Sequence, residues 1–428
     1  MKLTTKQKNK IVEKYISRNQ LKKLINASPE KGLFNIIVIP VLNEPEIKNT
    51  LHSLLNADKP EYPVEVILVI NSKQNENTEI VEQNRKTYND LINFAKENST
   101  KAFKIHPLLF ENLPAKTAGA GLARKIGMDE ALLRFNQDAD FGIITSLDAD
   151  TLVEKNYLTE LEKAFKNQSP EIALVYFEHK IEGTKYTENI YQAIAKYELY
   201  LRYYYQALKY IQFPFAYHTV GSAFAVTSVS YARYGGMSPK QAGEDFYFIQ
   251  KVAKNKQVVE LNSTAVYPSS RPSTRVIFGT GPAVAEISQT GIYNVYNLQS
   301  FFDVGIFLKQ IPAFFKIEKE NYDKILAKLP QAVVFFLNKI DFFNKLQKIN
   351  NNTTTLNNFT KAFFTIFDSF SLIRFLNETH QNNYYKKKEI TTQAQELLTK
   401  ISNQVPATTE ELLSVYRNLE KNTTTNKK

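Results

Sequence analysis

The sequence FNQDADFGIITSLDADT, residues 135–151, places one apolar run between two Asp-Ala-Asp triplets. The run, Phe141–Leu147, has the length and composition of a buried strand. The first triplet, Asp138–Asp140, precedes this strand, and the second, Asp148–Asp150, follows it. Ligands of open α/β sheets bind at the carboxyl ends of the strands. We therefore predict that the second triplet is functional and that the first belongs to an ordinary loop.

The spacing within the second triplet suits a cation. Residues two apart in extended backbone point the same way, so we expect Asp148 and Asp150 to face one ion while Ala149 turns away. Mg²⁺ and Mn²⁺ prefer carboxylate oxygens and usually keep positions open for substrate phosphates. The triplet therefore predicts a divalent metal site, for Mn²⁺ or Mg²⁺, that also takes a diphosphate.

Strand-like and helix-like segments alternate on both sides of this run. Continuous apolar strands separated by helices are typical of an α/β fold, with a mostly parallel sheet that helices cover. Further strands are predicted at Phe34–Val41, Val64–Ile70, Phe103–Leu109, Ile172–Phe177 and Gln257–Val266. Helices are predicted at Glu46–Asn56, Thr78–Glu97, Thr117–Phe135, Val153–Lys166 and Asn189–Tyr210.

The composition bounds the class of protein. The chain has 428 residues, 43% of them apolar, which is enough for one large domain with an appendage or for two domains. It has no cysteine, which excludes disulfides and thiolate metal sites. The basic N-terminus lacks the apolar stretch of a secretory signal, and the apolar run Ile36–Leu42 is too short to span a membrane. We therefore expect a cytoplasmic protein. A net charge of +11 suits phosphates, nucleotides, nucleic acid or an anionic membrane alike.

Polar residues follow the first two strands. The first strand runs through Pro40 into Asn43 and Glu44, a place where nucleotides are often contacted, although Asn43 can also cap the next helix. The second strand ends at Asn71 and Ser72, which either contact a base or ribose or form an ordinary turn.

A glycine-containing segment, AKTAGAGLARKIG, opens the helix before the acidic strand. Gly119 and Gly121 allow close backbone approach, and Arg124 adds charge. No predicted strand abuts these glycines, so the segment is a poor match to a dinucleotide-binding fingerprint. A contact with a sugar nucleotide, made by Arg124 or by the glycine-containing turn, is predicted instead, the alternative being a surface helix with a flexible start.

Two later segments complete the candidate site. Gly221 and Ser222 begin a run of small residues against which a ligand can lie close to the backbone. Gly243 precedes Glu244 and Asp245, which open a helix predicted over Phe246–Lys254. Acidic residues in a first helical turn are favoured by the helix dipole, but one of this pair can also act as a general base on a hydroxyl.

Arg271 and Arg275 lie in SSRPSTRVIFGTGPA, before a glycine-containing turn. Guanidinium groups there can neutralise a departing diphosphate or hold an anionic acceptor. Surface ion pairing is an equally good interpretation of these two arginines.

Taken together, these stretches resemble the GT-A (Rossmann-like) fold of family 2 glycosyltransferases over roughly residues 33–280. The pieces that carry the resemblance are IPVLNE, ARKIG, LDADT, GSAFAVTSVSYARYGGM and GED, in this order. Each piece is weak alone, and the order and spacing make the set specific.

The resemblance implies a transferase that uses a nucleotide-diphosphate sugar with Mg²⁺ or Mn²⁺. It implies that Asp148 and Asp150 form the metal and donor motif, and that Asp245, with Glu244 beside it, is the catalytic base of an inverting enzyme. It implies donor contacts for Pro40, Asn43, Glu44 and Arg124. Two departures stand out. The second strand ends in Ile70-Asn71-Ser72 without the acidic residue of many members, and the Gln-x-x-Arg-Trp motif of processive members is absent.

We therefore predict a basic helical segment at 1–30, a GT-A domain at 31–290, an α-helical C-terminal region at 291–420 and a disordered tail at 421–428. Within the C-terminal region, helices rich in Phe are predicted at Leu298–Phe315 and Ala332–Leu346, and a loop or linker at Asn350–Asn358. The predicted partners are a nucleotide-diphospho-sugar donor and a glycan, lipid or small-molecule acceptor, with no nucleic acid. The basic N-terminus also permits peripheral contact with the inner face of a membrane. A nucleotidyltransferase and a non-catalytic sugar-nucleotide-binding protein remain the alternatives.

Overall fold

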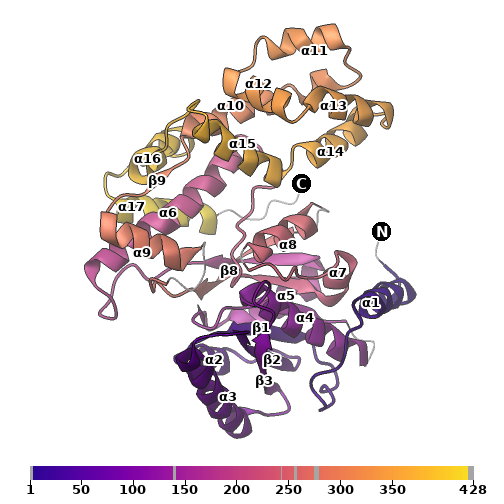
Figure 1. Ribbon diagram of the computed structural model, residues 1–428, viewed down its shortest axis with the longest axis vertical. Helices are drawn as coiled ribbons and strands as arrows, with labels where there is room; N and C mark the ends of the chain where they lie inside the picture. Colours follow the sequence, from indigo (N-terminus) through magenta and orange to yellow (C-terminus); the bar gives the residue numbers. More distant parts are fainter. Residues whose placement is uncertain (1–2, 138–140, 242, 255–257, 274–278, 423–428) are drawn as a thin grey trace. The chain divides into compact units, whose positions relative to one another are not determined.

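The computed structural model describes residues 3–137, 141–241, 243–254, 258–273 and 279–422 (Figure 1). The first acidic triplet, Asp138–Asp140, and Arg275 lie outside these described residues. The chain divides into two units. Unit 1 contains Met1–Tyr191, Thr219–Ala285 and Glu420–Lys428, and unit 2 contains Gln192–His218 and Glu286–Leu419.

An eight-stranded sheet in the order β3-β2-β1-β4-β7-β6-β8-β5 forms the centre of unit 1. The pairs β3–β2, β2–β1, β1–β4 and β6–β8 are parallel, β7 is antiparallel to both of its neighbours, and β5 is antiparallel to β8. The strands are Asn35–Val41 (β1), Val64–Lys73 (β2), Phe103–Leu113 (β3), Ile143–Ser146 (β4), Leu152–Val153 (β5), Ile172–Phe177 (β6), Phe224–Thr227 (β7) and Val258–Tyr267 (β8). The predicted mostly parallel sheet is confirmed.

Two short strands were not predicted from the sequence. β7 is only four residues of a small-residue run, too short to give a periodic signal. β5 contains Val153, which pairs with Val266, so the helix predicted from Val153 begins later, at Tyr157. Because β7 runs against its neighbours, it places the chain around Gly221 beside the end of β4.

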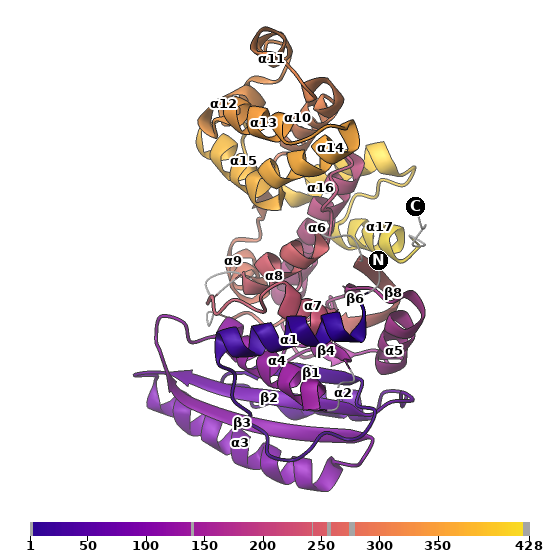
Figure 2. The ribbon, with the colours of Figure 1, turned by 90° about the vertical axis from the view of Figure 1, so that its right-hand side faces the viewer.

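Helices cover both faces of the β1–β3 part of the sheet (Figure 2). α3 packs on β2 and β3, whereas α4 packs on β1 and β2. A Cβ added to Gly127 of α4 would lie 2.4 Å from a methyl group of Val38, so glycine is needed for this close approach. The helices of unit 1 are Thr5–Asn19 (α1), Ile47–Leu55 (α2), Thr78–Asn98 (α3), Ala120–Gln137 (α4), Tyr157–Gln168 (α5), Ser228–Arg233 (α7) and Glu244–Ala253 (α8).

The N-terminal segment predicted to be helical over 1–30 is helical only in α1. Gln20 adopts a left-handed conformation, φ 49°, and ends the helix. The chain beyond it is held by Glu130 of α4, which accepts hydrogen bonds from the backbone N–H groups of Leu24 (2.9 Å) and Ile25 (3.1 Å). These backbone groups are satisfied by a side chain, so they need no helix.

A buried hydrogen-bond network fixes α1 to the rest of unit 1. Asp129 of α4 accepts from the hydroxyls of Tyr15 in α1 and Tyr231 in α7, each at 2.8 Å. The ammonium of Lys125 donates to the other oxygen of Asp129 at 2.7 Å. The basic N-terminal segment is therefore integrated into unit 1.

Unit 2 is mainly helical, as predicted, and also includes α6, Glu188–Tyr210, from Gln192 onward. α9 (Thr280–Thr290) enters unit 2 at Glu286. The remaining elements are β9 (Asn294–Val295), α10 (Leu298–Leu308), the 3₁₀ helix η1 (Ile311–Phe314), α11 (Lys319–Leu326), α12 (Gln331–Lys339), α13 (Phe342–Asn351), α14 (Leu356–Ile366), α15 (Ser369–Gln381), β10 (Lys388–Glu389), α16 (Ile390–Ile401) and α17 (Thr409–Lys421).

Two helices predicted in this region are each broken. The one predicted at Leu298–Phe315 divides into α10 and η1, which has Pro312 in its first turn. The one predicted at Ala332–Leu346 divides into α12 and α13 because Asp341 adopts a left-handed conformation, φ 52°. The linker predicted at Asn350–Asn358 shortens to the connection between α13 and α14.

Aromatic packing and one buried ion network stabilise unit 2. Phe307 packs against Phe342 and Phe363, with ring centroids 5.5 and 5.6 Å apart. Glu198 and Arg202 of α6 are fully buried and paired at 2.8 Å. Arg417 of α17 also contacts Glu198, at 2.7 Å, so this buried carboxylate is paired with two arginines.

No helix in the described part of the chain combines the length and the apolar character that crossing a membrane requires.

Candidate active site

Arg124 of α4 lies at the centre of the candidate site. Its Nη2 donates to Oδ1 of Asp148 at 2.6 Å, and its Nη1 donates to Oε1 of Glu244. The arginine side chain is only 3% exposed. A buried guanidinium is costly unless it is paired, and these two carboxylates pair it. Three predicted site residues from distant parts of the sequence therefore meet here.

A second arginine joins the other half of the acidic triplet to the first loop. Arg271 donates through Nη1 to Oε1 of Glu44 at 3.1 Å and through Nη2 to Oε2 of the same carboxylate. Its Nη2 also lies 3.4 Å from Oδ2 of Asp150. Glu44 is buried, whereas Asp150 is 32% exposed on its side chain. The forked geometry is the bidentate arrangement that guanidinium groups favour with carboxylates.

The acidic triplet itself forms a turn. β4 ends at Ser146, and the backbone N–H of Thr151 donates to the carbonyl of Asp148 at 3.2 Å. The extended backbone expected for Asp148–Asp150 is therefore wrong, because this hydrogen bond closes a four-residue turn. Each carboxylate instead contacts its own arginine, and the pair lies just beyond the carboxyl end of β4, as the strand assignment predicts.

Burial and neighbouring charges perturb the carboxyl group of Asp245. Removal from water raises the pKa of its carboxyl group, the neighbouring charge of Glu244 raises it further, and Arg124 opposes both effects, leaving a pKa of about 6. The backbone N–H of Phe246 donates to Oδ1 of Asp245 at 2.7 Å. Glu244 and Asp245 occupy the first turn of α8, as predicted, and Gly243 precedes them with φ 71°.

Gly221 packs directly against the charged groups. A Cβ added there would lie 2.8 Å from Oδ2 of Asp245 and 3.1 Å from Nη2 of Arg124. The carbonyl of Gly221 accepts a hydrogen bond of 2.7 Å from the hydroxyl of Ser146 in β4. Ser222 next to it is buried. The small-residue segment therefore brings backbone up to the acidic cluster.

The glycines at the start of α4 serve the chain's own packing. A Cβ on Gly121 would lie 2.0 Å from the carbonyl oxygen of Lys240, so this turn of the helix fits against the loop before α8. Gly119 adopts φ 144° and faces the backbone of Gln241. Gly119 and Gly121 therefore allow the start of α4 to pack against the loop before α8, which places Arg124 next to Glu244.

Hydrogen bonds connect the polar residues at the carboxyl ends of β1 and β2. Asn71 is buried, and its side-chain amide donates to the carbonyl of Val41 at 3.1 Å. The side chain of Asn84 in α3 donates to the carbonyl of Asn71 and accepts from the backbone N–H of Asn43, both at 2.9 Å. Asn43 adopts φ 49°, and the N-cap of α2 is Glu46, so Asn43 does not cap that helix. Pro40 lies within β1.

Sequence reasoning missed Ser146 and Asn84. Ser146 orients Gly221, and Asn84 fixes the loop that begins at Asn43. Ser146 lies one residue before the end of the predicted strand Phe141–Leu147, close enough to the triplet to have been proposed from the sequence. Asn84 lies inside a helical pattern, where nothing in the sequence distinguishes it from a solvated polar residue.

The fit of the site to a divalent cation rests on Asp148 and Asp150. Their side chains are 39% and 32% exposed, and carboxylate oxygens are suitable ligands for Mg²⁺ or Mn²⁺. Within the described residues no group of three or more His, Cys, Asp or Glu side chains could hold a metal ion. The donor set fits a cation that takes its other ligands from a phosphate-bearing substrate and water.

Comparison with known proteins agrees with this geometry. Residues 36–232 match the family model of glycosyl transferase family 2. Residues 36–232 thus form a segment that matches a family 2 glycosyltransferase domain. The match spans β1 to α7 and includes Arg124, the acidic triplet and Gly221. The matched family and its enzyme class, a glycosyltransferase, agree with the prediction from the sequence.

Solved structures of glycosyltransferases are also similar to this glycosyltransferase at low identity. A crystal structure of S. aureus TarS 1–349 is 11% identical and covers 82% of this chain and 93% of that one, with a TM-score of 0.38. The same protein in complex with UDP-GlcNAc is 12% identical and covers 78% and 91%, with a TM-score of 0.38. GalNAc-T7 with UDP, GalNAc and Mn²⁺ is 17% identical and covers 60% and 48%, with a TM-score of 0.34. No curated protein sequence matches the chain.

Proposed function

We propose that unit 1 transfers a sugar, with inversion, from a nucleotide-diphosphate donor to an acceptor hydroxyl, with the help of a divalent metal. The observation that carries the proposal is the packing of Asp245 and Arg124 against Gly221, with Asp148 hydrogen-bonded to Arg124. It combines a carboxylate whose pKa is about 6 with a buried guanidinium and a partly exposed acidic turn. A base and a diphosphate-binding group are the two components that glycosyl transfer needs.

The donor side of the site consists of the acidic turn and the two arginines. Asp148 and Asp150 would hold the Mn²⁺ or Mg²⁺, which neutralises charge on the diphosphate when bound. Arg271 is 28% exposed on its side chain and already faces Asp150. We expect the guanidinium of Arg271 to donate hydrogen bonds to the leaving diphosphate as well. Arg275, with Arg271 in the sequence, is proposed for the same role.

The acceptor side depends on Asp245. Its carboxylate accepts the proton of the acceptor hydroxyl while the oxygen forms a bond to the anomeric carbon. The bond from that carbon to the diphosphate oxygen breaks, and the nucleoside diphosphate leaves with the electron pair. A single displacement of this kind inverts the anomeric configuration. A pKa near 6 leaves the carboxylate ionised at neutral pH and more basic than an ordinary aspartate.

Glu244 has a different proposed role from Asp245. It is 6% exposed on its side chain and pairs with Arg124. We therefore assign it to positioning Arg124 and not to proton transfer. Pro40, Asn43, Asn71 and Ser222 remain proposed donor contacts, through the backbone near them where their side chains are buried.

The acceptor class and the location stay predictions. A glycan, a lipid or a small molecule can supply the hydroxyl, and the cytoplasmic location and peripheral membrane contact rest on the sequence alone. Pelleting with anionic vesicles, compared with neutral ones, tests the membrane contact.

Thermal stabilisation by a panel of UDP-, GDP-, dTDP- and CMP-sugars, each with Mn²⁺ or with EDTA, tests the donor proposal. A ligand that binds only the folded state raises the melting temperature in proportion to its binding free energy. We expect a metal-dependent shift with one nucleotide class, and we expect Asp150→Asn to remove it. A shift with nucleoside triphosphates alone, with pyrophosphate released on turnover, would favour a nucleotidyltransferase instead.

A further inference from the structure

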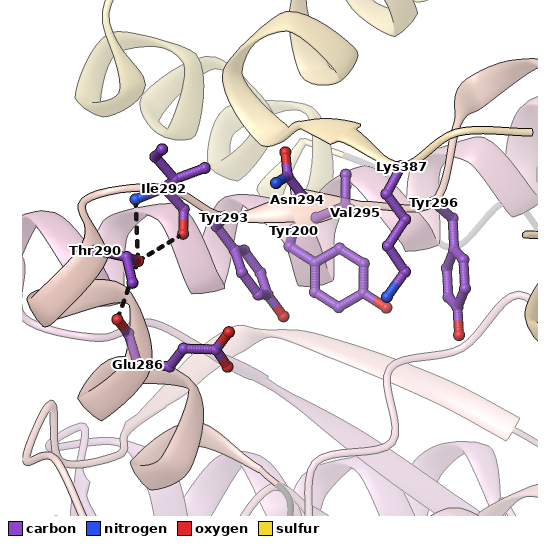
Figure 3. A pocket seen from close by; sticks show the side chains of 9 residues that line it. All are labelled: Tyr200, Glu286, Thr290, Ile292, Tyr293, Asn294, Val295, Tyr296 and Lys387. Carbon is purple, nitrogen blue, oxygen red and sulfur yellow. Dashed lines mark hydrogen bonds between the residues drawn. The ribbon is translucent and has the colours of Figure 1, made fainter. Parts of the chain in front are cut away.

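A cavity of about 520 Å³ lies within unit 2 (Figure 3). Its residues come from three elements and the loops beside them: Tyr200 from α6, Glu286 from α9, and Tyr293 and Tyr296 on either side of β9. Lys387, just before β10, completes the wall. A cavity of this volume is within the range of small-molecule sites, and none of its residues belongs to the active site in unit 1.

Backbone pairing fixes the wall of the cavity. β9 and β10 pair antiparallel, and the carbonyl of Tyr293 accepts a hydrogen bond of 3.0 Å from the backbone N–H of Ile390. Lys196 of α6 donates to the carbonyl of Gly291 at 2.7 Å and also contacts Glu389 at 3.2 Å. The loop that carries Tyr293 is thus fastened at both ends, so presenting its ring costs little conformational entropy on binding.

Tyrosine rings form one side of the cavity. The rings of Tyr200 and Tyr293 meet edge to face at 5.5 Å and 90°. Tyr296 lies on the same side of the cavity in Figure 3, and its hydroxyl donates a hydrogen bond to Oδ1 of Asn377 at 2.7 Å. In the described part of the chain the hydroxyls of Tyr200 and Tyr293 have no hydrogen-bond partner. Burial raises the pKa of both phenols, which keeps them neutral and able to donate.

Two opposite charges border the rings. Glu286 lies below Tyr293, and the amino end of Lys387 lies beside the hydroxyl of Tyr200 (Figure 3). The Lys387 ammonium is 5.6 Å from the centroid of the Tyr296 ring. The cavity therefore offers flat aromatic faces, phenolic donors and acceptors, one carboxylate and one ammonium within a single concave surface.

We propose that this cavity is a carbohydrate-binding site that takes one or two sugar rings of a glycan. A sugar ring presents C–H groups on its faces and hydroxyls around its edge. The C–H faces can lie on the tyrosine rings, which provide rigid contact area with only two side-chain torsions each. The edge hydroxyls can donate to Glu286 and accept from Lys387 and the free phenols.

The choice of a glycan over other ligands has two reasons. An apolar peptide would leave Glu286, Lys387 and the two phenols without partners in a partly buried surface, which is costly. A phosphate-rich ligand would bring negative charge towards Glu286. The inference rests on the proposed function in one respect: in a chain that transfers sugars, a separate site for sugar rings is best explained by a carbohydrate acceptor. The site then specifies the acceptor class as a carbohydrate.

The test measures saccharide binding to the full chain. The probes are N,N′-diacetylchitobiose, cellobiose, maltose and lactose, each followed by saturation-transfer-difference NMR and by titration calorimetry. The variants are Tyr293→Ala, which removes a ring, and Lys387→Ala, which removes an exposed charge without disturbing packing. Tyr210→Ala is the matched control, because Tyr210 is an exposed tyrosine of α6 outside the cavity.

We expect at least one disaccharide to bind, and we expect Kd to weaken about tenfold or more in both cavity variants, as for anchor residues of other interfaces. Tyr210→Ala should bind like the parent protein. The proposal is overturned if none of the four disaccharides binds, or if binding persists in both cavity variants. Donor-induced stabilisation, recorded on the same parent sample with the sugar-nucleotide panel, reports separately on the proposed function. A donor response without saccharide binding removes only the carbohydrate site, and the reverse result removes only the proposed transferase chemistry.

Discussion

Substituting alanine for Gly221 tests the packing of the proposed base most sharply. The added Cβ would lie 2.8 Å from Oδ2 of Asp245 and 3.1 Å from Nη2 of Arg124. Both distances are shorter than an ordinary van der Waals contact of a Cβ atom. Both atoms are the ends of side chains and can move aside, so we expect a loss of stability of only about 1 kcal/mol. Catalysis is less tolerant, because a displacement of about 1 Å at a reacting group costs roughly 100-fold in rate.

We therefore expect Gly221→Ala to lower kcat about 100-fold, which corresponds to about 2.7 kcal/mol in the activation free energy. The assay is release of nucleoside diphosphate from the donor that the panel identifies, with a melting curve for each protein. Gly305→Ala is the matched control. Its Cβ would meet Ile211 at 3.1 Å in unit 2, a similar overlap far from the base in the sequence. A folded Gly221→Ala protein with kcat within twofold of the parent would refute the packing argument.

Three further predictions concern the charged groups. The pKa of about 6 for Asp245 means that the ionised base is lost as pH falls, so kcat/KM should decrease below about pH 6 and level off above it, and Asp245→Asn should remove both the activity and this dependence. Replacing Glu244 by Gln breaks a buried pair with Arg124, and urea unfolding should report a loss of about 3–5 kcal/mol; a loss below 1 kcal/mol would show that the pair is not formed. Asp150→Ala should abolish turnover while Asp138→Ala keeps most of it, and equal losses in steady-state assays would mean that the two triplets have been assigned to the wrong ends of the strand.

Much of the fold was predictable because its signals are local. The buried strands are continuous apolar runs, and the position of the acidic triplet after one of them places Asp148 at the ligand-binding edge of the sheet. Glu244 and Asp245 were predictable as a helix start because Gly243 precedes them. These assignments need only neighbouring residues.

The pairing of the site was not predictable, because it depends on contacts far apart in the sequence. Arg124 and Glu244 are separated by 120 positions, and Arg271 and Glu44 by 227. Nothing periodic in the sequence relates such partners. The turn at the triplet was missed for a related reason, since its closing hydrogen bond joins backbone groups that every residue carries.

The helical character of the C-terminal region was predicted, but the positions at which its helices are interrupted were not. Asp341 ends one helix and starts the next through a left-handed backbone conformation, which aspartate adopts more readily than most residues but which its identity alone does not dictate. The cavity of unit 2 was likewise out of reach, because Tyr200 and Tyr293 meet only after α6 and β9 have packed.

The measurement that tests the central claim most directly is chromatographic detection of nucleoside diphosphate released from UDP-, GDP- and dTDP-sugars. The purified chain would be incubated with each donor, Mn²⁺ and the four disaccharides, beside the Asp245→Asn variant. The account predicts that one donor is converted to its nucleoside diphosphate and a longer saccharide by the parent protein and not by the variant. Consumption at equal rates by both proteins, or no consumption of any donor by folded protein, would contradict it.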